Sequence, residues 1–397
     1  MRWRSYIGGA AVQGSITAAL ATQALLAPRI LGAVDYGTAV AVLAMAFLVE
    51  VCVETVVLAL TIRWGMSREP ELRRLWTDAV TAAPFLGLLA VAFSLSPLWS
   101  LSPGERWTFV AGVPLLLTIW IPATVLIGTA YALHRHVAIA RCYLLGAIVL
   151  PGTIFLLRAH GSRSFLFGLL VDKVVAFASL AADRPVRDFC RGVAASAAAR
   201  LEAGRVWREY LPVLTPRLTL LLLSPGLVAA GAMLLPPYQL AGFKVSLSFV
   251  TAAGSVLPVS QYMLQAQWGK PANGREPATS SEIRFVLLGV LVVGIAFAAG
   301  LLLWGDALRA FVLHTADPVL RRFDVVFSAV PLFVLVGPLS AYLTALGDAR
   351  RMVLGFAASV AALVVSTAAG GLEWGFVGGN AAFVFFAASG VFSSAQR

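Results

Sequence analysis

The chain has 397 residues, of which 59% are hydrophobic and 12% are charged, and its mean hydropathy is +0.86. Because charged residues make up about 25% of an average soluble chain, this composition excludes an ordinary soluble protein. The formal net charge of +11 comes from basic residues scattered in short segments between apolar runs. No aromatic-interleaved basic patch or zinc-ligand spacing supports nucleic-acid binding. The composition therefore predicts an integral membrane protein with no nucleic-acid partner.

Apolar runs of about 20 residues recur along the whole chain, and each is long enough to cross about 30 Å of hydrocarbon as a helix. The alternating ten-residue strands of a membrane β-barrel are not seen. Hydropathy predicts an all-α polytopic protein with about 12 transmembrane helices. The predicted spans are 5–27, 37–63, 77–99, 107–133, 137–157, 164–182, 211–235, 237–265, 283–304, 324–346, 351–370 and 372–393.

The N-terminal sequence MRWR precedes an apolar stretch, which is also the charge layout of a signal peptide. Because many further spans follow, we interpret this stretch as an uncleaved first helix. An even number of spans puts both termini on one side, and loop charges predict that this side is the cytoplasm. Only a minority of the 30 Lys and Arg residues then fall in outer connections, namely Arg29, Arg106, Arg158, Arg163, Arg309, Arg321 and Arg322.

The longest polar stretch, residues 183–209, divides the predicted spans into six and six. We predict an N-terminal lobe over 1–182, a cytoplasmic linker over 183–209 and a C-terminal lobe over 210–397. The linker has the composition of a surface helix on the anionic inner leaflet, and equally that of a solvated connector. Two lobes of six spans would be parallel repeats. A weak internal match that places Gly37 over Gly242 fits such repeats.

Charged residues inside predicted spans are the most informative, since each costs about 2.5 to 3.5 kcal/mol at the bilayer centre on insertion scales. Glu50 and Glu54 lie four residues apart in the second span, so their carboxylates share one helical face. Two acids this close favour a proton or cation site, and a structural salt bridge to a neighbouring helix is the alternative.

Asp172 and Lys173 are adjacent near the centre of the sixth span. They either neutralise one another or point into separate sites about 100° apart around the helix. Arg217 near the inner end of the seventh span and Lys244 near the outer end of the eighth are long enough to snorkel to an interface. If they face inward, their positive charge suits a phosphate-bearing substrate.

The remaining candidate ligands do not predict a metal or cofactor site. Cys52, Cys142 and Cys190 share no close spacing, so neither a disulfide framework nor a thiolate metal site is indicated. His134 and His136 flank a basic residue in a short loop, a setting that suits an interface better than a metal ion.

The stretch APRILGAVDYGTAVAVLAMAFLVEVCVE resembles the signature of polysaccharide flippases, in which an Arg-x-Leu-Gly turn precedes an acidic or polar residue, an aromatic residue and Gly. The matching residues are Arg29, Leu31, Gly32, Asp35, Tyr36 and Gly37. From its position, Tyr36 suits the membrane interface and Asp35 is available as an N-cap. A later Leu-x-Ala-x-Gly stretch followed by basic residues also resembles this family, with Leu343, Ala345, Gly347, Arg350 and Arg351.

This resemblance implies the O-antigen type, polysaccharide branch of the MOP exporter superfamily, which also contains MATE antiporters and lipid II flippases. It implies two six-helix lobes, alternating access and a polyprenyl-diphosphate-linked oligosaccharide moved across a bacterial plasma membrane. The implied partners are that substrate, membrane lipids, and the polymerase and glycosyltransferases of the same pathway. We assign Arg217, Lys244 and Lys173 to substrate binding, and Glu50, Glu54 and Asp172 to coupling with H⁺ or Na⁺.

Two other classes stay open. A MATE-like antiporter of organic cations would use Glu50, Glu54 or Asp172 as its coupling acid. A membrane glycosyltransferase or polymerase would need a sizeable outer loop with catalytic groups, and the predicted outer loops are short. No G-x-x-x-x-G-K-[ST] phosphate loop is present, which disfavours an ATP-driven motor. We therefore expect a secondary transporter without cofactor rather than an enzyme.

Overall fold

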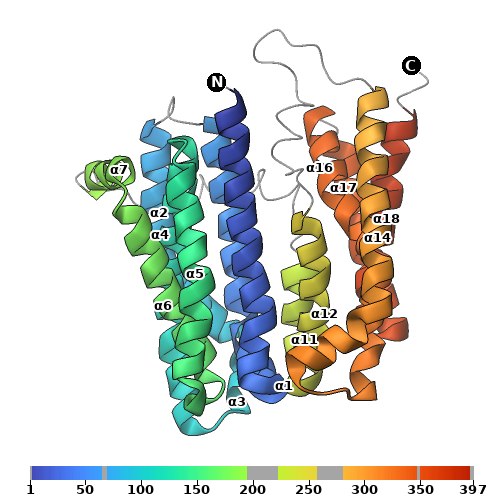
Figure 1. Cartoon of the computed structure of the whole chain (residues 1–397), viewed down its shortest axis with the longest axis horizontal. Helices are drawn as coiled ribbons and strands as arrows, with labels where there is room; N and C mark the ends of the chain where they lie inside the picture. The colour runs from blue at the N-terminus through green and yellow to red at the C-terminus, as the bar shows by residue number, and fades with distance from the viewer. Residues whose placement is uncertain (1, 65–68, 195–221, 257–279, 347–348, 394–397) are drawn as a thin grey trace. The chain divides into compact units, whose positions relative to one another are not determined.

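The structure, a computed structural model, describes residues 2–64, 69–194, 222–256, 280–346 and 349–393. These residues are helical almost throughout, with no strand among them (Figure 1). The helices in chain order are α1 (Arg2–Trp64), α2 (Glu69–Phe93), α3 (Leu95–Trp99), α4 (Pro103–Ala132), α5 (His136–Leu156), α6 (Arg163–Ala181), α7 (Arg184–Ala194), α11 (Leu227–Leu234), α12 (Pro237–Val256), α14 (Ser280–Leu313), α15 (Val325–Ser328), α16 (Val330–Leu346), α17 (Ala349–Gly370) and α18 (Leu372–Ser393).

Each predicted span overlaps a described helix, and the all-α polytopic class is confirmed. By length and apolar composition, 7 described helices are able to cross a membrane, or up to 8 if the bent pair Pro318–Ser328 and Val330–Leu343 forms one span. Parts of the predicted spans 211–235 and 237–265 lie outside the described residues. The total of 12 spans and the cytoplasmic side of both termini therefore stay predictions.

The first two predicted spans lie in α1, which consists of two helices joined at a kink at Gly32. A straight helix of 63 residues would be about 95 Å long at 1.5 Å per residue, about three times the hydrocarbon thickness. Gly32 has φ 78° and ψ 169°, a conformation that is essentially restricted to glycine. In Figure 1, α1 turns back at the end of the molecule opposite the N-terminus.

The described residues form two compact units, Met1–Leu214 with Val228–Ala241, and Thr215–Leu227 with Gly242–Arg397. In the first unit, α1 packs against α5 and α4, and α6 packs against α4 and α5. The predicted linker 183–209 begins with α7, whose Phe189 is buried beside Leu72 and Trp76 of α2. The apolar side chains of Val186 and Phe189 in α7 are therefore covered by protein, and the role of the linker stays a prediction.

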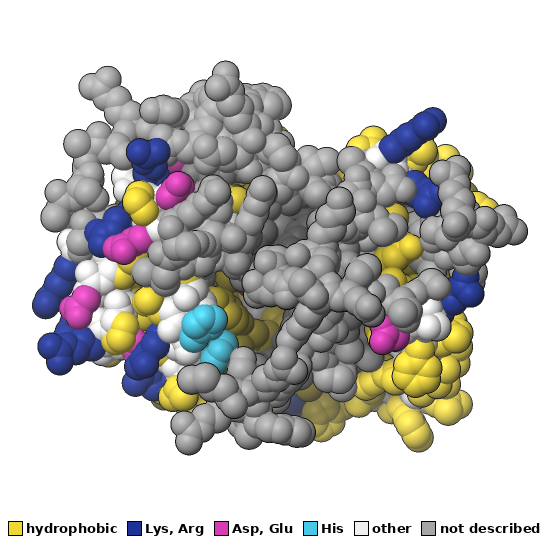
Figure 2. Space-filling view, turned by 90° about the horizontal axis from the view of Figure 1, so that it is seen from above, with side chains coloured by type: hydrophobic (Ala, Val, Ile, Leu, Met, Phe, Trp, Pro, Cys, Tyr) yellow, Lys and Arg dark blue, Asp and Glu magenta, His cyan; other side chains and the backbone are white. Residues whose placement is uncertain are grey.

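The two ends of the first unit differ in side-chain chemistry. Trp99 and Trp107 are 70% and 71% exposed near the start of α4, and Arg106 lies 4.5 Å from the Trp99 ring centroid. Exposed Trp is typical of a membrane–water interface. At the other end of α4, Arg135 donates hydrogen bonds to Asp183, which raise the pKa of the Arg135 guanidinium. Figure 2 looks onto this end, where basic and acidic side chains alternate over the first unit.

In the second unit, α17 packs closely along α18, and α16 packs against α14 and α18. Ser359 of α17 is buried and donates a hydrogen bond of 2.9 Å to the carbonyl of Gly379 in α18. Small residues of this kind allow close approach of two helices within a membrane. Exposed Trp304 and Trp374 occur near the end of α14 and the start of α18, again as expected at an interface.

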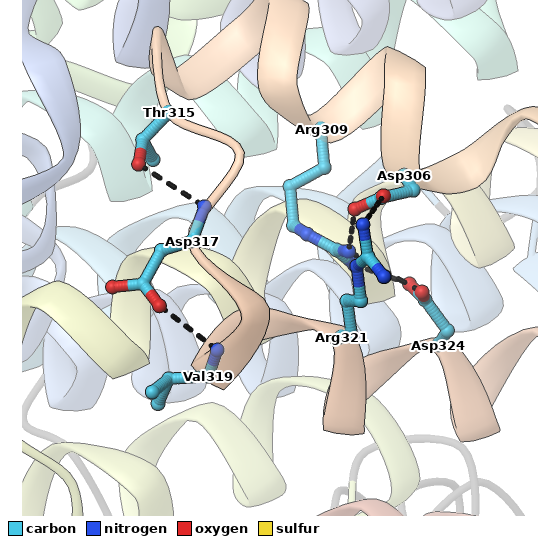
Figure 3. Close-up of polar contacts among 7 residues, drawn as sticks. All are labelled: Asp306, Arg309, Thr315, Asp317, Val319, Arg321 and Asp324. Atoms are coloured by element: carbon cyan, nitrogen blue, oxygen red, sulfur yellow. Dashed lines mark hydrogen bonds and ion pairs between the residues drawn. The ribbon is translucent and has the colours of Figure 1, made fainter.

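The segment 304–324, predicted to lie outside, is partly helical: α14 continues to Leu313, and a 3₁₀ turn covers Pro318–Asp324. Arg309 is only 1% exposed and forms ion pairs with Asp306 (2.8 Å) and Asp324. Arg321 joins the network through Asp306 at 3.0 Å (Figure 3). The side chain of Asp317 accepts a hydrogen bond from the backbone N–H of Val319 (2.9 Å) and caps the 3₁₀ turn. These charges fix the connection to α14.

A side chain at position 32 is expected to destabilise the turn between the two halves of α1. Gly32→Ala should lower the stability of the purified protein by about 1 to 3 kcal/mol, the usual cost of a sparsely populated backbone conformation. Thermal unfolding in detergent measures the change. Gly152→Ala is the control, because Gly152 is helical and has open space around it. Equal melting temperatures for the two variants would contradict this account of the turn.

Loss of the buried guanidinium should be more damaging than loss of the exposed one. Arg309→Ala leaves Asp306 and Asp324 without their buried partner, so we expect a cost of about 3 kcal/mol. Arg321→Ala removes a side chain that is 60% exposed and should cost under about 1 kcal/mol. The melting temperatures of the two variants test this prediction. A larger loss of stability in Arg321→Ala than in Arg309→Ala would overturn it.

Candidate functional site

Glu50 and Glu54 lie on the second half of α1, in the interior of the first unit. Glu50 is 5% exposed, and Glu54 is partly buried one helical turn further along. The two carboxylates interact electrostatically with each other. This interaction is consistent with the prediction that the two carboxylates share one helical face.

Glu50 is held by α4. The Thr124 hydroxyl, itself buried, donates a hydrogen bond of 3.1 Å to Glu50 Oε1. Trp120 lies one turn earlier on α4 and also interacts with the Glu50 side chain. Phe47 of α1 packs edge-to-face on the Trp120 ring at a centroid distance of 5.8 Å. The carboxylate is thus positioned by a hydroxyl and by an aromatic wall.

Asp172 and Lys173 of α6 form an ion pair, with Lys173 Nζ 2.8 Å from Asp172 Oδ2. The ammonium also lies 4.6 Å from the centroid of the Trp120 ring, within the range of a cation–π interaction. Glu50 and Glu54 both interact electrostatically with this ammonium. Of the two alternatives for this pair, the structure shows local neutralisation with the two carboxylates of α1 nearby.

Helix α5 closes the cluster. A Cβ atom at Gly146 would collide with Asp172 Oδ1, so this glycine leaves the space that the carboxylate occupies. Tyr143, one turn away from residue 146, interacts electrostatically with Glu54. We call Glu50, Glu54, Asp172 and Lys173 the acidic cluster, since one carboxylate pairs with the ammonium and the other two interact with it electrostatically. Within the described ranges, no group of three or more His, Cys, Asp or Glu side chains is arranged to hold a metal ion.

A different charged site lies in the second unit. Lys244 of α12 is partly exposed and is flanked in sequence by the buried residues Phe243 and Val245. Among the residues that the structure describes, no carboxylate pairs with it. Ser248 and Thr251 follow at i+4 and i+7, so they lie on the same helical face as Lys244. Ser248 is buried, and the Thr251 hydroxyl donates a hydrogen bond to the Leu247 carbonyl of its own helix.

The other predicted residues have more varied outcomes. Arg217 lies outside the described residues, as does Gly347, so their roles stay predictions. Tyr36 was expected at the membrane interface, but it is 1% exposed and packs edge-to-face on Phe165 at 5.5 Å. This correction arises because α6 begins beside the second half of α1. Gly37 allows contact with the Pro237 backbone, which a Cβ atom would prevent.

Sequence reasoning missed Thr124, Trp120, Tyr143 and Gly146. Thr, Trp and Gly are common in membrane helices, and nothing in their local pattern shows which acid they face. Prolines at 114 and 122 mark α4 as irregular, but they do not identify its partner. Only the packing of α4, α5 and α6 around α1 brings these residues to the acidic cluster.

No family model matches this sequence, and no curated protein matches it either. Solved structures do. The eukaryotic MATE transporter AtDTX14 is similar with a TM-score of 0.62 and 12% identity, over 98% of this chain and 96% of that one. The lipid II flippase MurJ, in an inward closed conformation, has a TM-score of 0.62 and 12% identity, over 98% of this chain and 87% of that one.

A multidrug resistance MATE family transporter of the MOP superfamily, in an inward-facing conformation, is also similar. Its TM-score is 0.54 at 12% identity, over 99% of this chain and 94% of that one. The chain shares the fold of these transporter structures. It is a multi-pass membrane protein, and the predicted likeness to this superfamily is confirmed at the level of fold. At this identity the likeness does not distinguish a drug antiporter from a lipid flippase.

The hydrogen bond from α4 to Glu50 is expected to contribute to stability. Thr124→Val removes the donor and leaves a buried carboxylate oxygen unsatisfied, so the cost should be about 1 to 3 kcal/mol. Thr129→Val is the matched control, because the Thr129 hydroxyl is buried on the same helix but bonds to the Val125 carbonyl of its own turn. Thermal unfolding should rank Thr124→Val as the less stable variant, and equal losses would argue against this role.

Proposed function

We propose that the chain is a secondary transporter that flips a polyprenyl-diphosphate-linked oligosaccharide across a bacterial plasma membrane by alternating access. The observation that carries this proposal is Lys244, an ammonium on α12, the helix of the predicted eighth span, that pairs with no carboxylate in the described ranges. A charge left uncompensated within a membrane span is costly. It is understandable if an anionic ligand supplies the missing charge during the transport cycle.

The chemistry of α12 fits the polar head of such a substrate. An ammonium is a common phosphate-binding group, and the hydroxyls of Ser248 and Thr251 on the same face suit sugar or phosphate oxygens. Arg217, which we also assign to the substrate, would add a second cation. The cavity must shield a charged head while the lipid tail stays in the bilayer.

Coupling is assigned to Glu50, Glu54 and Asp172. Three carboxylates with one ammonium carry a net negative charge when all are ionised, so binding of H⁺ or Na⁺ changes the charge of the cluster. Lys173, which sequence reasoning placed with the substrate, is engaged by Asp172 and Trp120. We therefore move it from substrate binding to the coupling cluster. The proposed partners stay the lipid-linked glycan, membrane lipids, and the pathway polymerase and glycosyltransferases.

A MATE-like antiporter of organic cations is the second candidate. The acidic cluster favours it, because buried carboxylates attract cationic drugs, and two of the similar structures are MATE transporters. Lys244 argues against it, because an ammonium without a carboxylate partner among the described residues repels a cationic substrate. An enzyme of glycan synthesis has no observation of its own in support.

Glycan export in cells lacking the chromosomal gene tests the first candidate. Lys244→Ala should reduce export by about tenfold or more at normal membrane abundance, since a hydrogen bond to a charged group contributes about 1.5 to 3 kcal/mol. Lys244→Arg should retain most of the activity. Lys270→Ala, in a connection predicted to face the cytoplasm, is the control for loss of one positive charge.

The same strains separate the two candidates. Unchanged export in Lys244→Ala would remove this residue from the substrate site. Binding of the fluorescent cation ethidium that is lost in Glu54→Gln, together with unaffected glycan export, would establish the antiporter instead.

A further inference from the structure

We propose that the ammonium of Lys173 is a built-in cation that occupies the acidic cluster, so that the cluster responds to protons and excludes Na⁺. This inference rests on the proposed coupling role of Glu50, Glu54 and Asp172, and it identifies the ion that they select. In this proposal, Lys173 determines the ion specificity of the cluster.

The first observation concerns the groups that contact the Lys173 ammonium. Lys173 Nζ lies 2.8 Å from Asp172 Oδ2 and 4.6 Å from the Trp120 ring centroid. A carboxylate and an aromatic face are two groups that bind cations well when water is excluded. Asp172 itself is confined by the space beside Gly146. The cluster therefore holds a cation that is covalently part of the protein.

The second observation is that the charge of Lys173 also interacts with groups other than Asp172. Lys173 interacts electrostatically with both Glu50 and Glu54 of α1. Helix α4 contributes Thr124 and Trp120, which are uncharged. Helix α5 contributes Tyr143 and Cys142, whose electrostatic contacts include Glu54 and Lys173 respectively. Among these groups, the ammonium is the one positive charge.

These observations determine which ion is able to act at the cluster. A Na⁺ ion needs several oxygen ligands, and Asp172, which could supply one of them, is already paired with the ammonium. Two cations in this volume would repel each other. A proton has no such requirement, because it joins one carboxylate oxygen and leaves the ammonium in place. Protonation of Glu50 or Glu54 removes a negative charge from around Lys173, and the ammonium is then held mainly by Asp172.

The experiment measures ion binding without any substrate. Purified protein in detergent is titrated with NaCl, with choline chloride at equal ionic strength as the control, while thermal unfolding is followed at several pH values. The wild type should show a pH-dependent melting temperature and no difference between the two salts. Lys173→Met keeps an unbranched side chain over Trp120 but lacks the charge, and should be stabilised by Na⁺ in preference to choline.

The expected gain in apparent Na⁺ affinity for Lys173→Met over the wild type is about 5- to 150-fold, the usual range for coupling between two sites. Lys173→Arg should behave as the wild type does. Adding Glu50→Gln to Lys173→Met should abolish the Na⁺ effect, which shows that the ion binds at this cluster rather than at the surface.

Two results would overturn the proposal: Na⁺-specific stabilisation of the wild type, or a folded Lys173→Met protein indifferent to Na⁺. If Lys173→Met does not fold, the wild-type salt comparison still decides the outcome. Because no glycolipid is used, failure of the flippase proposal is seen separately, as normal glycan export in cells that lack the gene.

Discussion

The cost of ionised groups in hydrocarbon is the constraint on which the rest of this structure depends. The chain meets it in two different ways. Arg309, near the predicted outer surface, is enclosed by carboxylates on both sides and serves to fix α14 to the next turn. Lys173 pairs with its neighbour in sequence and lies over an indole ring. In the first arrangement, both carboxylates pair directly with the buried cation. In the second, the cation pairs with one carboxylate, and two further carboxylates interact with it electrostatically.

The two units divide the charged chemistry between them. In the first unit the second predicted span carries acids in its later half, and they are gathered by α4, α5 and α6. In the second unit α12, its proposed counterpart in an internal repeat, carries a base in its outer half and hydroxyls along the same face. An acidic cluster in one unit and Lys244 in the other suit the proposed transporter, in which one unit would bind the coupling ion and the other an anionic head group.

Hydropathy was sufficient to predict the class and the positions of most helices, because about 20 apolar residues have few alternatives to a membrane helix. Helical periodicity was sufficient to place Glu50 and Glu54 on one face. Neither pattern predicts tertiary contacts. Thr124 and Trp120 are recognisable only once α4 lies beside α1, and the burial of Tyr36 depends on α6. The pairing of Asp172 with Lys173 was open in the sequence, because adjacent residues on a helix point in different directions.

The turn at Gly32 has a consequence for how the protein enters the membrane. Between residues 5 and 49 the chain carries only Arg29 and Asp35 as ionised groups, and both lie close to this turn. Their charges cancel, so carrying the tip of the hairpin to the far side does no net electrical work against the membrane potential. The two halves of α1 are therefore suited to enter the bilayer together as one hairpin, with the later helices assembling around a pair that is already in place.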